Sequence, residues 1–217
     1  MRGLIEKDLR LTISRKQTLL IFFIMVLSVG MSMDGTFIVG YMTMLGAIIA
    51  VGTISYDEFD NGYAFLMTLP FERKTYVSEK YLFCLCMEAA AWCVGALIYC
   101  LGSLVRSGGG NPAADLPMLA SLIPALFLSV SVFIPLVLKY GSEKSRVALF
   151  MVFGLTALAA FGAKQAMSGQ EQAFAGLEKA LDALPPAVIL LILTAVCGLL
   201  SFISYLVSLR IMEKKEF

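Results

Sequence analysis

The chain has 217 residues and a formal net charge of +1, with 59% hydrophobic and only 15% charged residues. A soluble globular domain carries about 45–50% apolar and about 25% charged residues, so this composition predicts a membrane protein. The near-neutral charge provides no basic excess for binding nucleic acid.

The residues needed for most enzyme sites are missing from the sequence. Histidine does not occur, which excludes Ser-His-Asp and Cys-His nucleophiles and the His-containing zinc motifs. No Gly-x4-Gly-Lys-Ser/Thr motif is present, so the chain cannot hydrolyse ATP by P-loop chemistry. Cys86, Cys93 and Cys100 recur every seven residues, which favours a small-residue helix face over a thiol or metal site. We therefore predict no catalytic residue, bound metal or cofactor in this chain.

Met1 to Lys16 mixes apolar and basic residues at near-helical spacing. This pattern predicts a short amphipathic helix on the inner membrane surface, with its basic groups among anionic headgroups. A cleaved signal peptide fits less well, because the polar lead is long and no A-x-A-like site follows the apolar run.

The rest of the chain predicts an all-α membrane protein with six transmembrane helices. We expect residues 1–217 to form a single transmembrane domain, without a nucleotide-binding domain. A span needs about 20 apolar residues. The expected spans are 17–33, 36–54, 82–105, 118–138, 147–163 and 187–209. The polar stretch 139–146 is expected to be a short turn between the fourth and fifth spans. Before the last span, an apolar stripe predicts an amphipathic helix on the extracellular surface; it consists of Phe174, Leu177, Leu181 and Leu184.

Basic residues predict the orientation of the six spans. If both termini are cytoplasmic, only Arg106, Lys164 and Lys179 lie outside, and the other fourteen of the 17 Lys and Arg residues lie inside. Such a bias follows the positive-inside rule, and an odd number of spans would destroy it. We therefore expect both termini in the cytoplasm.

With this topology, Ser55 to Tyr81 is the longest cytoplasmic connection. An apolar stripe of Phe59, Tyr63 and Leu66 lies beside acidic residues, which predicts a helix that ends at Pro70. Two interpretations remain open. The helix either shields its aromatic residues at the membrane interface, or docks its aromatic and acidic side chains on a partner protein.

The segment with YDE, NGY and LMTLPFERKTYVSEKYL resembles the small permeases of type-2 ABC exporters, in particular the branch that exports peptides and bacteriocins. The motif covers about residues 55–82, whereas the topology is similar over the whole chain. The resemblance implies a multi-pass protein of the bacterial cytoplasmic membrane. It also implies a dimer with an identical or related permease, and two separate ATPase subunits that bind ATP and Mg²⁺. The cytoplasmic helix would be the coupling helix, and its expected contact residues are Tyr56, Asp57, Glu58, Phe59, Asp60, Tyr63 and Leu66.

A weaker set of candidates lies within the spans. Glu88 is a carboxylate inside the third span, which by default suggests a functional site, although a structural hydrogen bond or an interfacial position is also open. Pro124 and Pro135 could kink the fourth span. We expect these residues to line a substrate pathway.

The leading hypothesis is therefore an exporter permease for an amphipathic peptide or a hydrophobic compound. The alternative is a polytopic membrane scaffold or immunity protein that does not transport.

Overall fold

The computed structural model describes the chain except for residues 33–34, 60–61, 69–70, 106–114, 168–183 and 216–217. All regular elements in the described part are helices. They are α1 (Arg2–Ser14), α2 (Lys16–Ser32), α3 (Gly35–Glu58), α4 (Gly62–Met67), α5 (Arg73–Val105), α6 (Leu116–Ala120), α7 (Ile123–Met167) and α9 (Pro186–Lys214).

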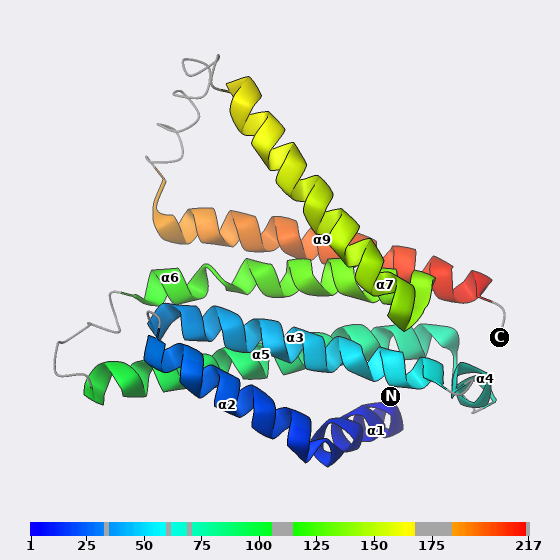
Figure 1. The fold of residues 1–217 in the computed structure, drawn as a ribbon. Coiled ribbons are helices and arrows are strands. Elements are labelled where there is room, and N and C mark those ends of the chain that lie inside the picture. The colour runs from blue at the N-terminus through cyan, green and yellow to red at the C-terminus, as the bar shows by residue number, and fades with distance from the viewer. Residues whose placement is uncertain (33–34, 60–61, 69–70, 106–114, 168–183, 216–217) are drawn as a thin grey trace.

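The long helices form one bundle (Figure 1). Helix α3 packs against α5 and α7, and α9 packs against α5 and α7. Helix α2 lies beside α3. Both termini, α1 and α4 lie at the same end of the bundle, which we call the terminal end (Figure 1).

Four described helices are long and apolar enough to cross a membrane. They cover Phe37–Glu58, Arg73–Ser103, Leu116–Gly141 and Pro186–Lys214, close to the expected second, third, fourth and sixth spans. Helix α2 has 17 residues, about 26 Å at 1.5 Å per residue. Residues 147–163 belong to α7. Six spans therefore stay a prediction, and most of the expected extracellular helix lies outside the described residues.

Helix α7 replaces the expected polar turn at 139–146. It runs from Ile123 to Met167 and is interrupted only at Gly141, where φ is 75° and ψ is 175°. A positive φ favours glycine, and an added Cβ would also overlap the Glu58 carboxylate. Beyond Gly141 the helix runs away from the bundle (Figure 1).

The expected kink at Pro124 is a helix boundary. Helix α6 ends at Ala120, and Pro124 is the second residue of α7. A proline costs little in a first helical turn, because its missing N–H would have no intrahelical partner there. The indole N–H of Trp92 donates to the carbonyl of Leu119 at this break, at 3.2 Å.

The bundle is packed most tightly between α3 and α5. A Cβ added to Gly46 of α3 would lie 2.7 Å from the Cβ of Ala91 and 3.4 Å from the Cα of Glu88. Small residues permit such close approach between membrane helices. By contrast, Cys86 and Cys93 are exposed, so the small-residue face predicted from the cysteine spacing lies on the outside of this chain.

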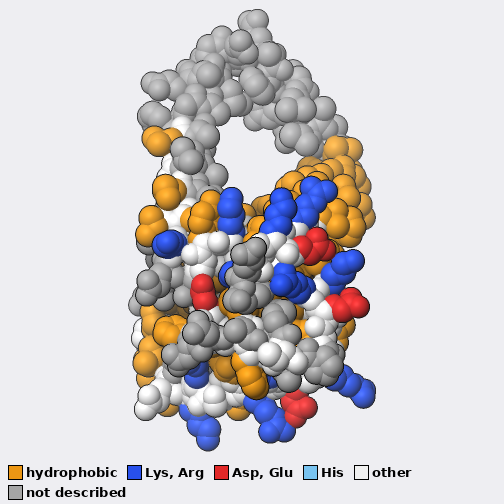
Figure 2. All heavy atoms as spheres, turned by 90° about the vertical axis from the view of Figure 1, so that its right-hand side faces the viewer, with side chains coloured by type: hydrophobic (Ala, Val, Ile, Leu, Met, Phe, Trp, Pro, Cys, Tyr) orange, Lys and Arg blue, Asp and Glu red, His pale blue; other side chains and the backbone are white. Residues whose placement is uncertain are grey.

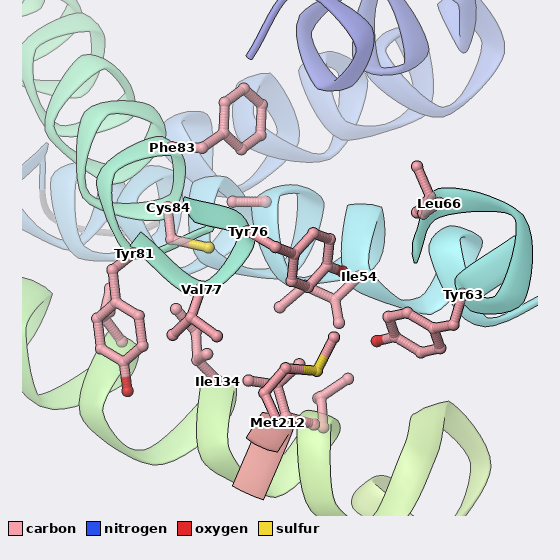
Figure 3. Close-up of a cluster of buried hydrophobic side chains, with 14 residues drawn as sticks. Ile54, Tyr63, Leu66, Tyr76, Val77, Tyr81, Phe83, Cys84, Ile134 and Met212 are labelled. Atoms are coloured by element: carbon pink, nitrogen blue, oxygen red, sulfur yellow. The ribbon is translucent and has the colours of Figure 1, made fainter. Parts of the chain in front are cut away.

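A hydrophobic core forms at the terminal end of the bundle, where α3, α4, α5, α7 and α9 meet (Figure 3). Ile54, Tyr76, Ile134 and Met212 are fully buried in it. The outside of the spans is apolar: Leu191, Leu199 and Phe202 of α9 are all at least 60% exposed, as suits a helix facing lipid. Lys and Arg side chains gather on the terminal end itself (Figure 2).

We predict that Gly141→Ala lowers the free energy of unfolding by about 1–3 kcal/mol, because it forces alanine into a strained backbone conformation. Gly154→Ala is the matched control: it lies in the same helix, and an added Cβ would meet nothing within 4 Å. Thermal unfolding in detergent measures both variants. Equal melting temperatures for the two would contradict this account of the α7 break.

Candidate coupling site

The expected coupling segment is divided between two helices. Tyr56, Asp57 and Glu58 complete the last turn of α3, and α4 is a separate helix of six residues, Gly62–Met67. The break lets α4 turn back against the bundle, so that Tyr63 and Leu66 are buried in its core. The described residues do not form the continuous helix expected over 56–66.

Asp57 points into the protein, where it meets a buried lysine from α5. The Lys80 ammonium lies 2.8 Å from Asp57 Oδ2 and also binds Asp8 Oδ2 of α1. Its third contact is the Thr53 hydroxyl, at 3.2 Å. The side chains of Lys80 and Asp8 are 0% exposed and that of Asp57 is 5% exposed. One lysine therefore joins three helices.

Two further groups complete this cluster. The Lys7 ammonium of α1 binds Asp57 Oδ1 and lies 3.2 Å from Asp8 Oδ1. The Tyr76 hydroxyl donates to Asp57 Oδ2 at 3.0 Å. We call Lys7, Asp8, Asp57, Tyr76 and Lys80 the ionic cluster. Each carboxylate in it contacts both lysines, as buried charges require.

A further buried acid, Glu79, lies next to Lys80 in the sequence but is not part of the ionic cluster. Glu79 of α5 is 0% exposed, and neither of its carboxyl oxygens has a hydrogen-bond partner among the described residues. An unsatisfied buried polar group costs about 1–3 kcal/mol. This part of the protein is thus held together by strong contacts but also carries a local energetic cost.

Helix α4 is fixed to the same region by Tyr63. Its ring packs edge-on against the ring of Tyr76, with centroids 5.9 Å apart. The Lys215 ammonium lies over the Tyr63 ring, 4.5 Å from its centroid. Burial raises the pKa of the Tyr63 hydroxyl, so this group stays neutral. Burial lowers the pKa of Lys215, an effect opposed by the Glu58 carboxylate.

The end of α9 is fastened to the start of α5. The Arg73 guanidinium donates to the carbonyls of Met212 and Glu213, at 3.0 and 2.8 Å. Lys215 donates to the Leu138 carbonyl of α7 at 3.2 Å. A cation near the last carbonyls of a helix is favourable. Contacts from α5 and α7 therefore hold the end of the last helix at the terminal end.

The remaining expected coupling residues lie closer to the surface. Phe59 is 65% exposed, and Phe65, which we did not single out, is 69% exposed. The Arg15 guanidinium lies 3.5 Å from the ring centroid of Tyr56. Glu58 faces Gly141, and Asp60 lies outside the described residues. The two phenylalanines are thus the most exposed aromatic side chains among the described residues of this segment.

The expected substrate-pathway residues lie on two neighbouring helices, α5 and α7. Glu88 is fully buried in α5. Its Oε2 lies 2.7 Å from the Ser129 hydroxyl of α7, within hydrogen-bond distance. Pro124 is at the start of α7, and Pro135 is eleven residues further along the same helix. Their role in a pathway stays a prediction.

Of the ionic cluster, sequence reasoning singled out Asp57 alone. It missed Lys7, Asp8 and Lys80 as ion-pair partners, and it did not single out Tyr76 or the neighbouring Glu79. Only Asp8 left a usable signal. It is an acid in a basic segment. It lies four residues after Leu4 and four before Thr12, and all three are buried on the same face of α1. A period of about four marks one face of a helix.

These features define a multi-pass, all-helical membrane protein with a charged and hydrogen-bonded hub at one end. A family model described as "ABC-2 family transporter protein" matches residues 3–213. The chain belongs to this family and is a permease component of an ABC transporter, a membrane subunit that is not itself catalytic and that associates with ABC ATPase partners. Comparisons with curated proteins and with solved structures give no match.

We predict that Lys80→Met lowers the free energy of unfolding by about 3–5 kcal/mol, because it leaves two buried carboxylates without their shared lysine. The control Lys74→Met removes an exposed charge from the same helix and should change stability by less than about 0.5 kcal/mol. Adding Asp8→Leu and Asp57→Leu to Lys80→Met should restore part of the loss. Thermal unfolding of the purified protein measures all three variants, and equal effects at positions 74 and 80 would contradict a buried ion pair.

Proposed function

We propose that this chain is the permease of an ATP-driven exporter in the bacterial cytoplasmic membrane. In this proposal it pairs with an identical or related permease, and two ATPase subunits bind ATP and Mg²⁺ beneath the pair. Both termini and the segment 56–66 face the cytoplasm. The substrate is an amphipathic peptide or a hydrophobic compound, since the spans offer few polar groups.

One observation carries the coupling part of this proposal: the ionic cluster ties α1, α3 and α5 together directly behind the 56–66 segment. A force applied to this segment is passed through the buried contacts of Lys80 to α3 and α5, two helices that can cross the membrane. ATP-dependent movement of the ATPase then changes the permease conformation, provided that the ATPase binds the two conformations with different affinity.

The burial pattern refines which residues would touch the ATPase. Asp57, Tyr63 and Leu66 are buried and hold the segment in place. Phe59 and Phe65 are exposed, and exposed aromatic groups are typical anchors at protein interfaces. We therefore propose Phe59 and Phe65 as the anchors, with the three buried residues as their support.

We predict that Phe59→Ala with Phe65→Ala releases the ATPase, because a buried aromatic anchor is worth about 2 kcal/mol or more. The measurements are co-purification in mild detergent and ATPase activity stimulated by the complex. Phe23→Ala is the matched control, since Phe23 is 57% exposed but lies in α2, away from this segment. Normal ATPase stimulation by the double variant would contradict the anchor assignment.

Failure of the wild-type chain to recover any P-loop ATPase would contradict the exporter proposal as a whole. It would favour the alternative of a membrane scaffold that does not transport.

A further inference from the structure

Glu88 differs from the other buried carboxylates that make ion pairs. Asp8 and Asp57 each contact lysines. Glu88 is also 0% exposed, but none of the ion pairs among the described residues involves it. It lies within a helix that can cross the membrane. An isolated carboxylate in such a place is costly.

The donors and acceptors around Glu88 do not balance if it is ionised. Its Oε2 is 2.7 Å from the Ser129 hydroxyl, and that hydroxyl is 2.8 Å from the Leu126 carbonyl. A serine hydroxyl has one proton to donate. It can therefore donate to only one of the two at a time. The Leu126 carbonyl lies inside α7 and already accepts a helical N–H, so an ionised Glu88 would have this hydroxyl as its one hydrogen-bond donor among the described residues. Glu88 Oε1 has no hydrogen-bond partner among the described residues.

A proton on Glu88 Oε2 makes the donors and acceptors of Glu88, Ser129 and Leu126 match. The carboxylic acid then donates to Ser129 Oγ, and Ser129 donates to the Leu126 carbonyl. Both observed contacts become hydrogen bonds at the same time, and no unpaired charge remains in the apolar interior.

Among the described residues, the neighbouring helices bring no cation to Glu88, and its one hydrogen-bond partner is the Ser129 hydroxyl. On α5, the titratable neighbour is Cys84, one turn earlier, which is fully buried. Helix α3 presents Gly46, close to the Glu88 backbone, and the Thr43 hydroxyl nearby on α3 donates to its own helix at Val39. Helix α7 contributes Ser129. Glu79 and Lys80 lie two turns away or more, at the ionic cluster.

We propose that Glu88 is a proton-binding site between α3, α5 and α7, and that it holds a neutral carboxylic acid in the packing seen here. Separation of α5 from α7 would bring water to the carboxyl group, which would then release its proton to the solvent. Proton binding and close packing of these helices therefore favour each other, because the proton binds one arrangement better than the other. This proposal does not depend on the transported substrate or on an ATPase.

Infrared spectroscopy of the purified full-length chain in lipid nanodiscs tests the proposal. At neutral pH, the wild type should show the carbonyl stretching band of a protonated carboxylic acid. Glu88→Gln should lose the Glu88 component of this band. The matched control Glu213→Gln alters a glutamate that is exposed near the end of α9 and should leave the band unchanged. Equal bands in the wild type and Glu88→Gln would overturn the proposal.

Stability supplies a second measurement. Glutamine has nearly the shape of the neutral acid and can donate its N–H to Ser129, so Glu88→Gln should insert in the membrane and unfold close to the wild-type temperature. Glu88→Ala, which leaves a cavity between the helices, should unfold at a clearly lower temperature. A Glu88→Gln variant that fails to accumulate, or that is as unstable as Glu88→Ala, would overturn the proposal.

Discussion

The terminal end of this protein depends on one buried ammonium group that binds two carboxylates. Lys80 of α5 binds Asp57 of α3 and Asp8 of α1, and all three are shielded from water. Coulomb energy grows as the local dielectric falls, but so does the cost of dehydration. Such a group is therefore tolerated only where several partners are held in place. The tight α3–α5 packing, the edge-on tyrosines and the clamped end of α9 provide that rigidity.

Much of the fold could be predicted from the sequence because the apolar runs of membrane helices are long and the polar breaks between them are short. Four expected spans agree with helices in the structure. The expected turn at 139–146 was wrong in form: a single glycine with positive φ changes the direction of α7. A polar composition indicates a change of direction, but it does not distinguish a loop from a helix break.

The candidate site was harder to predict, because sequence spacing shows which residues share a helix face but not which face turns inward. Asp57 and Tyr63 were expected to contact a partner, and this stays a prediction; in the structure both are buried, in contact with Lys80 and Tyr76 of α5. The partners of Lys80 are 72 and 23 positions away in sequence, so no local pattern could link them. The exposed Phe59 was identified by its type and position, whereas Phe65 lies off the stripe that we followed.

The sequence separation within the ionic cluster also has a consequence for how the protein is made. Lys80 follows Asp8 by 72 residues, a delay of roughly 4 to 14 s at about 5–20 residues per second. During this interval Asp8 of α1 has been synthesised, but Lys80, its ion-pair partner from α5, has not. The contact that buries Asp8 of α1 can therefore form only after α5 has been synthesised.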